Sequence, residues 1–102
     1  MNYVANFFAG LFVCNCIPHL VSGLQGMPFP SPFAKPIGIG NSSPVVNFLW
    51  GTSNVLISAF LLVKFPVIVG LEASFIVFII GAVAIGTYLA VHFGNVRLSK
   101  RT

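Results

Sequence analysis

The sequence contains almost no acidic residues. Glu72 is the one acid among 102 residues, and charged residues of both signs make up 6% of the chain. A single carboxylate excludes paired-acid catalysis, and the lack of aspartate excludes a Ser-His-Asp triad. Soluble domains carry roughly 25% charged residues, which keep their surface wet. We therefore expect a non-enzymatic protein that is surrounded mostly by lipid; an enzyme would need His19 as its general base.

Basic residues are also few, and they are clustered. The net charge is +4, and Arg97, Lys100 and Arg101 directly follow an apolar run. Such a cluster is typical of a cytoplasmic membrane anchor, in which each charge near anionic headgroups contributes about 1 kcal/mol. No basic face is present to neutralise several phosphates, so we expect no nucleic-acid partner. We predict that Lys35 and the three C-terminal basic residues contact lipid headgroups.

Three apolar stretches are each long enough to cross a bilayer. At about 1.5 Å per residue, each helix would reach roughly 30 Å, the thickness of the hydrocarbon core. An isolated strand would leave its backbone unpaired in lipid, so helices are expected. The predicted fold is an all-α membrane protein, with three transmembrane helices in a small bundle and a proline-rich cytoplasmic loop. Its single domain (residues 1–102) comprises helices at 3–24, 45–65 and 71–93, a loop at 25–44 and a basic tail at 94–102.

Residues at the ends of these stretches indicate where the helices begin and end. Ser43 supplies an N-cap hydroxyl for the second helix, and Pro66 ends that helix. Glu72 is expected in the first turn of the third helix, and Gly94 is expected to end it. The connection at 66–70 is short, so the second and third helices should form a tight antiparallel hairpin.

The distribution of basic residues predicts the orientation. With three spans, the loop that holds Lys35 and the C-terminal tail share one side, and the opposite side has only Lys64. Because basic residues favour the cytoplasm, the N-terminus should lie outside and the C-terminus inside. The first apolar stretch lacks preceding basic residues, so we expect it to remain as a helix rather than act as a cleaved signal.

Polar residues follow one face of each of the first two helices. Spacings of three and four residues place them on a common face. Lipid contact is costly for polar groups, so both strips should point inward and toward each other. They form either a site for a small ligand, proton or headgroup, or interhelical hydrogen bonds worth well under about 2 kcal/mol each. The strips are Asn15, His19 and Ser22 on the first helix, and Asn47, Gly51, Asn54 and Ser58 on the second.

Small residues predict close helix contacts. On the third helix, Ala82, Gly86 and Ala90 recur every four residues, as Gly51 does within the second strip. Such residues let another backbone approach closely. The partner of the third helix is either another helix of this chain or a second copy.

Metal or cofactor binding depends on few residues. His19 and His92 are the two histidines, and they are candidates for axial ligands of haem or a chlorophyll-type pigment. The alternative is that each bonds a neighbouring helix or a headgroup. Cys14 and Cys16 are two residues apart, so on a helix they point to opposite faces and do not form a metal pair. We expect no cofactor and no metal.

Three strings resemble a family of small, uncharacterised bacterial integral membrane proteins. They are N-C-I-P-H at residues 15–19, M-P-F-P-S-P-F-A-K-P at 27–36 and S-S-P-V-V-N-F-L-W-G at 42–51. The resemblance covers roughly the first half of the chain. It implies a bacterial source and a location in the inner membrane, and it transfers no catalytic or binding role.

Two functional hypotheses follow. The first is an accessory or structural subunit of a bacterial inner-membrane assembly, which packs against other membrane chains or copies of itself. The second is a homo-oligomeric protein that binds or transports a small molecule or ion along the polar strips. Transport predicts that His19→Ala or Asn54→Ala abolishes flux, whereas the accessory hypothesis predicts that Gly86→Leu releases a partner.

Overall fold

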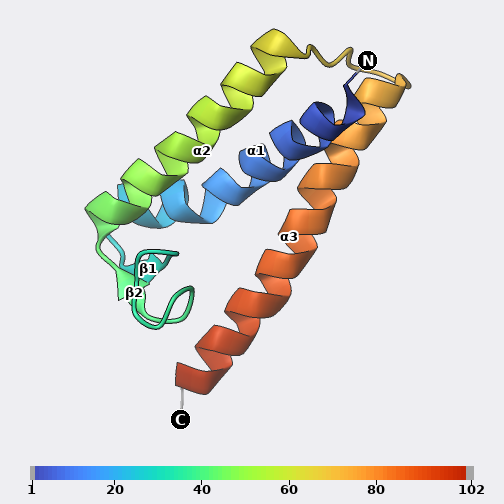
Figure 1. The fold of residues 1–102 in the computed structure, drawn as a ribbon. Coiled ribbons are helices and arrows are strands. Elements are labelled where there is room, and N and C mark those ends of the chain that lie inside the picture. The colour runs from blue at the N-terminus through green and yellow to red at the C-terminus, as the bar shows by residue number, and fades with distance from the viewer. Residues whose placement is uncertain (1, 101–102) are drawn as a thin grey trace.

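The computed structural model describes residues 2–100. It is mostly helical, with three long helices and one short pair of antiparallel strands (Figure 1). The three helices are long and apolar enough to cross a membrane, which confirms the prediction of three helices of transmembrane length. The elements are α1 (Tyr3–Leu24), β1 (Phe29–Pro30), β2 (Asn41–Ser42), α2 (Pro44–Lys64) and α3 (Ala73–Lys100).

Side chains at two helix starts cap the backbone. The Asn2 Oδ1 atom accepts a hydrogen bond from the Ala5 amide at 3.0 Å, before α1 begins. The Ser43 Oγ atom accepts from the Val46 amide at 3.2 Å, and proline occupies the first position of α2. These bonds satisfy amides that have no partner within the helix.

The third helix corrects the predicted range 71–93. It begins at Ala73, so Glu72 precedes its first turn, and it continues through Gly94 to Lys100. Gly94 does not adopt the left-handed conformation that would end a helix. A glycine inside a helix costs about 1 kcal/mol, which the following residues offset because Arg, Leu and Lys are good helix formers. The predicted tail at 94–102 is thus helical as far as Lys100.

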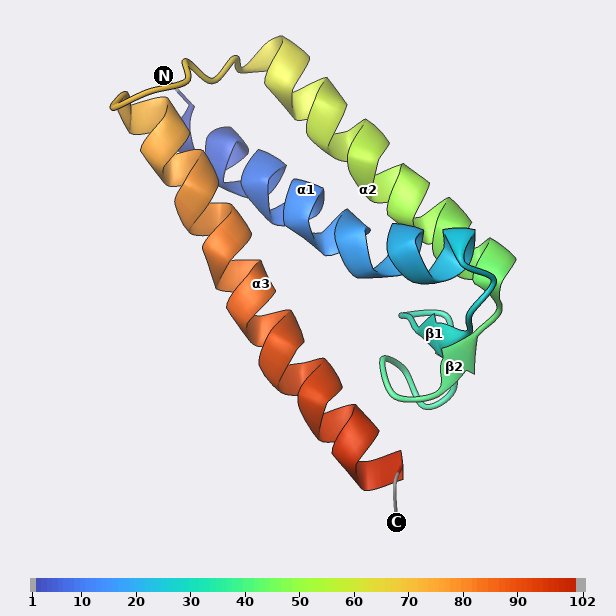
Figure 2. The ribbon, with the colours of Figure 1, turned by 180° about the vertical axis from the view of Figure 1, so that it is seen from behind.

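Helix α1 packs against both other helices, and α2 and α3 diverge on either side of it (Figures 1 and 2). The prediction of a tight hairpin between α2 and α3 is therefore wrong. Their connection runs across the end of the molecule instead of making a tight turn (Figure 1). The Asn6 side chain of α1 holds it there, donating from Nδ2 to the Phe65 carbonyl at 3.0 Å.

Glycines allow α1 and α3 to cross with their backbones in contact. A Cβ atom on Gly10 would overlap the carbonyl oxygen of Phe78, and one on Gly81 would overlap that of Phe7. Both glycines are buried. The close approach of these two helices therefore requires glycine on each side of the crossing.

The predicted strip of small residues on α3 lies partly along this contact. A Cβ atom on Gly10 would also lie 3.1 Å from the Ala82 amide nitrogen, and one on Gly86 would lie 3.2 Å from Cys14 Sγ. Ala90 is exposed. Ala82 and Gly86 therefore pack against α1 of the same chain, and Ala90 does not.

The interior of the molecule is polar, and its exterior is apolar. The largest fully buried side chains are all asparagine or serine, whereas leucines and valines on the outside reach 71–99% exposure, as at Leu24, Val63 and Leu71. A soluble protein shows the opposite arrangement, because burying apolar surface drives its folding. In lipid that drive would be absent, and close packing and hydrogen bonds would hold the helices together. The buried polar residues are Asn6, His19, Ser31, Asn47, Asn54, Ser58 and Ser74.

The proline-rich segment between α1 and α2, residues 25–43, folds compactly around strands β1 and β2, and it is called the ribbon below. Strands β1 and β2 pair in the register Phe29 with Ser42 and Pro30 with Asn41. The Phe29 ring packs against Phe93 of α3, with ring centroids 4.7 Å apart. The ribbon lies near the C-terminal end of α3, at the opposite end of the molecule from the connection between α2 and α3 (Figures 1 and 2).

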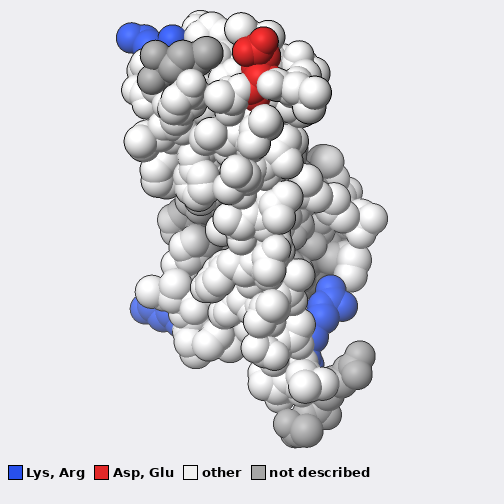
Figure 3. All heavy atoms as spheres, turned by 90° about the vertical axis from the view of Figure 1, so that its right-hand side faces the viewer, with Lys and Arg blue, Asp and Glu red and all other residues white. Residues whose placement is uncertain are grey.

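The charged side chains within residues 2–100 lie at the two ends of the molecule. Lys64 ends α2 and Glu72 precedes α3, whereas Lys35 belongs to the ribbon segment and Arg97 and Lys100 to the last turns of α3. The faces between the ends are uncharged in the view of Figure 3. Arg101, also predicted to contact headgroups, lies outside the described residues.

Candidate functional site

The two polar strips face each other across α1 and α2, as the spacing predicts. His19 Nδ1 lies 2.7 Å from Asn47 Oδ1. One turn earlier in α1, Asn15 Nδ2 donates to Asn54 Oδ1 at 2.9 Å. His19, Asn47 and Asn54 are 2%, 0% and 0% exposed, so these bonds replace water that the groups have lost.

The rest of the strip also lies between the helices. Ser58 Oγ donates to the Ala9 carbonyl at 2.8 Å. A Cβ atom on Gly51 would lie 2.7 Å from Leu20 Cγ, which shows how closely α2 approaches α1. Ser22 is half-buried, and within residues 2–100 its hydroxyl makes none of the bonds between the two helices.

Asn47 connects α1, α2 and the ribbon. Its Nδ2 atom donates to the carbonyls of Phe29, Ser42 and Ser43 at 2.9, 3.2 and 3.2 Å. Because carbonyl oxygens only accept hydrogen bonds, the end of the Asn47 side chain beside these three carbonyls must be its NH2 group. The side-chain oxygen of Asn47 therefore faces His19. A buried His19 without a carboxylate beside it is neutral, and it must donate from Nδ1. Its Nε2 atom is therefore a hydrogen-bond acceptor.

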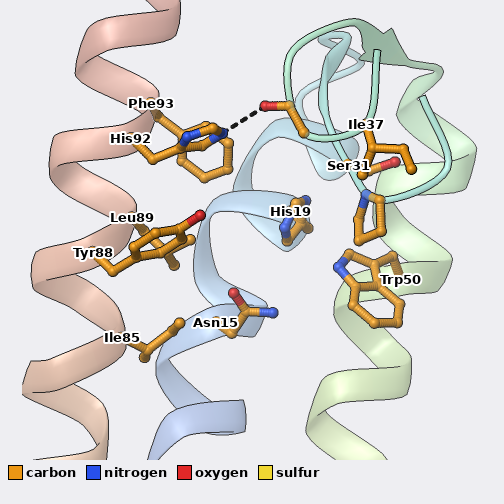
Figure 4. Close-up of a pocket in the computed structure, with 12 residues that line it drawn as sticks. Asn15, His19, Ser31, Ile37, Trp50, Ile85, Tyr88, Leu89, His92 and Phe93 are labelled. Carbon is orange, nitrogen blue, oxygen red and sulfur yellow. Dashed lines mark hydrogen bonds between the residues drawn. The ribbon is translucent and has the colours of Figure 1, made fainter. Parts of the chain in front are cut away.

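A cavity of about 260 Å³ lies beside His19, bordered by α1, α2, α3 and the ribbon (Figure 4). His19 stands between Trp50 of α2 and the Tyr88–His92 face of α3 in this view. No charged side chain of the described residues lines the cavity. Its walls are mostly aromatic and aliphatic, with a few polar atoms, as in sites for small molecules. The main lining residues are Asn15, His19, Ser31, Trp50, Ile85, Tyr88, Leu89, His92 and Phe93.

Two side-chain nitrogens on residues that line this cavity lack protein partners within residues 2–100. Trp50 Nε1 is the one fully enclosed side-chain nitrogen or oxygen within residues 2–100 that makes no hydrogen bond. His19 Nε2 has no protein hydrogen bond in the same part of the chain, since its ring bonds only through Nδ1. An enclosed donor without a partner costs about 1–3 kcal/mol. Of the two nitrogens, His19 Nε2 is the acceptor without a partner, on a residue that lines the cavity.

The ribbon borders the cavity and contacts α3. His92 Nε2 donates to the Gly38 carbonyl at 2.7 Å (Figure 4). Gly38 has a φ of 71°, and a Cβ atom there would lie 3.3 Å from His92 Nε2. Lys100 Nζ donates to Asn41 Oδ1 at 3.1 Å, which is a second link between α3 and the ribbon. The position of the ribbon thus depends on α3 as well as on Asn47.

The two histidines considered as haem or pigment ligands line the same cavity. Each already uses one ring nitrogen, His19 with Asn47 and His92 with Gly38. Within residues 2–100, no group of three histidine, cysteine or acidic side chains is close enough to hold a metal ion.

The residues predicted to contact lipid headgroups are exposed. Lys35, Arg97 and Lys100 lie at the ribbon end of the molecule, and none of them borders the cavity beside His19. Arg97 lines a separate apolar groove between α1 and α3. These positions suit contact with headgroups at one surface of a membrane.

On the aromatic side of the site, sequence reasoning singled out His92 but not Trp50 or Phe93. Trp50 lies three residues after Asn47 and four before Asn54, so its place beside the second strip was readable. Tyr88 and His92 share a face of α3 through their spacing of four, and their rings stack with centroids 5.7 Å apart. The sequence carried no signal that the ribbon would bring these faces to one cavity.

Comparison with protein-family models, with curated proteins and with solved structures gives no match. The family resemblance therefore stays a prediction. The geometry defines the chain as a three-helix protein of membrane type with a polar interior and a cavity at one end.

Proposed function

We propose that this protein binds a small neutral molecule in the cavity beside His19, without catalysing a reaction. One observation carries the proposal: His19 is buried beside the cavity, and its Nε2 atom, a hydrogen-bond acceptor, has no partner within residues 2–100. Buried polar groups are almost always bonded, and the exceptions call for a specific reason. A ligand that donates a hydrogen bond to His19 supplies that reason.

The cavity limits the size and charge of such a ligand. Its volume of about 260 Å³ exceeds the roughly 150 Å³ that accommodates benzene, so a molecule of one or two rings fits. The described lining residues are uncharged, and a charged ligand would lose its hydration without gaining a counter-charge. A neutral, mostly apolar molecule is therefore favoured, and it can enter from the lipid.

The polar strips support binding more than transport. Asn54 and Ser58 are used in hydrogen bonds to α1 of the same chain, and both are fully buried. A path for an ion along them would require those bonds to break. Asn15 and His19 reach the cavity, so the strips contribute its polar wall.

Trp50 provides the test, because it is the single tryptophan of the chain. The full-length protein in lipid nanodiscs is titrated with naphthalene while Trp50 emission is recorded. The proposal predicts a saturable change that Leu89→Phe, which fills the cavity, greatly reduces. The matched control Phe60→Leu alters an exposed ring that does not line the cavity, and it should leave the titration unchanged. A change that merely follows the partitioning of naphthalene into lipid, alike in all three proteins, would refute binding.

An accessory role is the second candidate, and a separate groove favours it. An apolar groove of about 340 Å³ lies between α1 and α3, and the small residues Gly86, Ala90 and Gly94 line it at spacings of four. Ala90 is exposed, and a Cβ atom on Gly94 would meet nothing within 4 Å. Small residues at this spacing allow a helix of another chain to approach closely.

The accessory role is tested by the substitution Ala90→Leu. It should release a co-purifying membrane partner, because the leucine would occupy the groove. Ala84→Leu is the matched control, since Ala84 is also exposed on α3 but does not line the groove. Native mass spectrometry of protein extracted gently from its membrane measures both. An unchanged set of co-purifying chains in Ala90→Leu would exclude this groove as the contact.

For localisation, we propose a multi-pass protein of the bacterial inner membrane. Lys35, Arg97 and Lys100 share one end of the molecule, and that end is the basic one. By the preference of basic residues for the cytoplasm, the ribbon and the C-terminus face inward and the N-terminus outward. The cavity then lies toward the cytoplasmic leaflet, where the basic residues contact lipid headgroups.

A further inference from the structure

We propose that the groove between α1 and α3 binds one acyl chain of an anionic phospholipid, whose headgroup phosphate lies beside Arg97. The groove measures about 340 Å³ and is a different space from the cavity beside His19. Arg97 is the one charged residue among the described residues that line it. Binding of the phospholipid does not depend on a ligand in the cavity.

The groove exists because α1 and α3 touch at a crossing and then diverge. Their backbones are in contact where Gly10 meets Phe78. From there the two helices separate toward the ribbon end of the molecule (Figures 1 and 2). Gly86, Ala90 and Gly94 line the α3 side of the groove and carry little or no side chain to fill it. The result is an open wedge between the helices.

The walls of the groove suit a hydrocarbon chain. Apart from Arg97, the described lining residues carry no charged, amide or hydroxyl side chain. Water needs roughly two to four polar partners to stay in such a space. In a membrane the open side of the wedge faces lipid, so a hydrocarbon chain fills it better than water. The larger lining residues are Cys14, Ile17, Pro18, Phe29, Leu89 and Phe93.

The length of the groove matches one leaflet of a bilayer. Along α3 it extends from Gly86 to Arg97, a rise of roughly 16 Å at about 1.5 Å per residue. Half of a hydrocarbon core about 30 Å thick is roughly 15 Å. A phospholipid with its headgroup beside Arg97 therefore places its acyl chain along the whole groove, as far as Gly86.

The charge at the end of the groove favours an anionic headgroup. Glu72 is the one acidic residue of the chain and lies at the other end of the molecule, so no acidic side chain pairs with Arg97. A guanidinium group donates two parallel hydrogen bonds to phosphate oxygens. One basic residue near an anionic headgroup raises affinity about fivefold. Arg97 therefore supplies the counter-charge for the phosphate.

A helix of another chain is the competing occupant of this groove. Such a helix would have to bring an acid to Arg97, or leave that charge without a counter-charge. A soluble phosphate compound would pair with Arg97 but would leave the apolar walls unfilled. A phospholipid supplies the hydrocarbon and the anion in one molecule, and the membrane supplies it in excess.

The experiment is native mass spectrometry of the full-length protein, released from nanodiscs that contain equal amounts of phosphatidylglycerol and phosphatidylcholine with the same acyl chains. We expect one retained phospholipid per chain, with phosphatidylglycerol enriched about fivefold. Arg97→Gln should abolish the enrichment but still retain a phospholipid. Lys100→Gln is the matched control, because it removes the same charge three positions along α3 from a residue that does not line the groove. It should leave the enrichment unchanged.

The substitution Ala90→Leu tests the groove itself. The leucine would occupy the space of the acyl chain, so retention of both phospholipids should fall. Ala84→Leu, on an exposed part of α3 away from the groove, should leave retention unchanged. Glycerol phosphate added in solution should not displace the bound lipid, since it lacks the acyl chain.

The opposite results would overturn the proposal. Equal loss of enrichment in Arg97→Gln and Lys100→Gln would indicate diffuse surface charge in place of a site. Unchanged retention in Ala90→Leu would place the lipid elsewhere, and displacement by glycerol phosphate would exclude a role for the acyl chain. A protein chain retained in place of the lipid, and lost in Ala90→Leu, would assign the groove to a partner helix. Because the enrichment compares two lipids on one protein sample, loss of folded protein does not imitate the expected result.

Discussion

His19 and Asn47 are separated by 28 positions in the chain, yet His19 Nδ1 lies 2.7 Å from Asn47 Oδ1 inside the protein. This bond joins α1 to α2. The Nδ2 atom of the same Asn47 side chain donates to carbonyls of the ribbon, so Asn47 also joins the two helices to the ribbon. It fixes the histidine proton on Nδ1, and it leaves Nε2 free at the cavity. A bond that holds the fold together thus also sets the chemistry of the site.

Asn47→Ala should lower the free energy of unfolding by about 2 kcal/mol. The change leaves His19 Nδ1 and ribbon carbonyls without their partner in a fully buried position. Asn54→Ala is the matched control on the same helix, and it removes one bond to α1. It should cost nearer 0.6 kcal/mol, the average for such bonds in membrane helices. Reversible denaturant titration in mixed micelles measures both, and equal losses would contradict the special position of Asn47.

Gly10→Ala should destabilise the protein by about 1–3 kcal/mol, because the added methyl group overlaps the backbone of α3 at Phe78. Gly94→Ala adds the same methyl group to α3 at a position with open space within 4 Å. It should leave stability unchanged or raise it by up to about 1 kcal/mol, since alanine favours the helix. The midpoint of thermal unfolding in detergent gives the comparison. A Gly10 variant as stable as the Gly94 variant would refute backbone contact at the crossing.

His92→Phe should loosen the ribbon without unfolding the helices. The change keeps an aromatic ring but removes the 2.7 Å bond to the Gly38 carbonyl. We expect amide hydrogen exchange at residues 31–40 to accelerate about tenfold, which corresponds to the loss of roughly 1.4 kcal/mol of local stability. Exchange within α1 and α2 should stay unchanged. Unaltered exchange in the ribbon would show that Asn47 and Lys100 hold it without His92.

Labelling from the two sides of the membrane tests the proposed orientation. In a background that carries Cys14→Ala and Cys16→Ala, Ile37→Cys places a thiol in the ribbon and Leu71→Cys places one between α2 and α3. Both positions are exposed. An impermeant maleimide added to intact cells should label the second variant and spare the first. The reverse pattern would contradict the orientation that the basic residues predict.

The amount of structure readable from the sequence depended on the kind of contact. Periodicity placed Asn15 and His19 opposite Asn47 and Asn54, because polar groups in lipid-facing helices can only turn inward. Asn6 was missed, since its partner is the Phe65 carbonyl at the end of α2 rather than a residue of the strip. A backbone acceptor at a helix end leaves no pattern in a sequence.

The order of the helices in space was the main error. A short connection at 66–70 favoured direct packing of α2 on α3, but α1 packs against both. The contact surfaces decide the outcome: Gly10 and Gly81 let α1 and α3 touch through their backbones. Neither Gly10 nor Gly81 belongs to a four-residue repeat of small residues, so no pattern in the sequence indicated their contact. Trp50 was unremarked for a related reason, because its importance comes from the ribbon and α3 together.

The most direct test of the account is a structure of the protein with bromonaphthalene, determined at the bromine absorption edge. Anomalous scattering locates the bromine without reference to the rest of the density. The account predicts one strong peak inside the cavity bordered by His19, Trp50 and Tyr88. Bromine found only along the lipid-facing surfaces of the helices would contradict it.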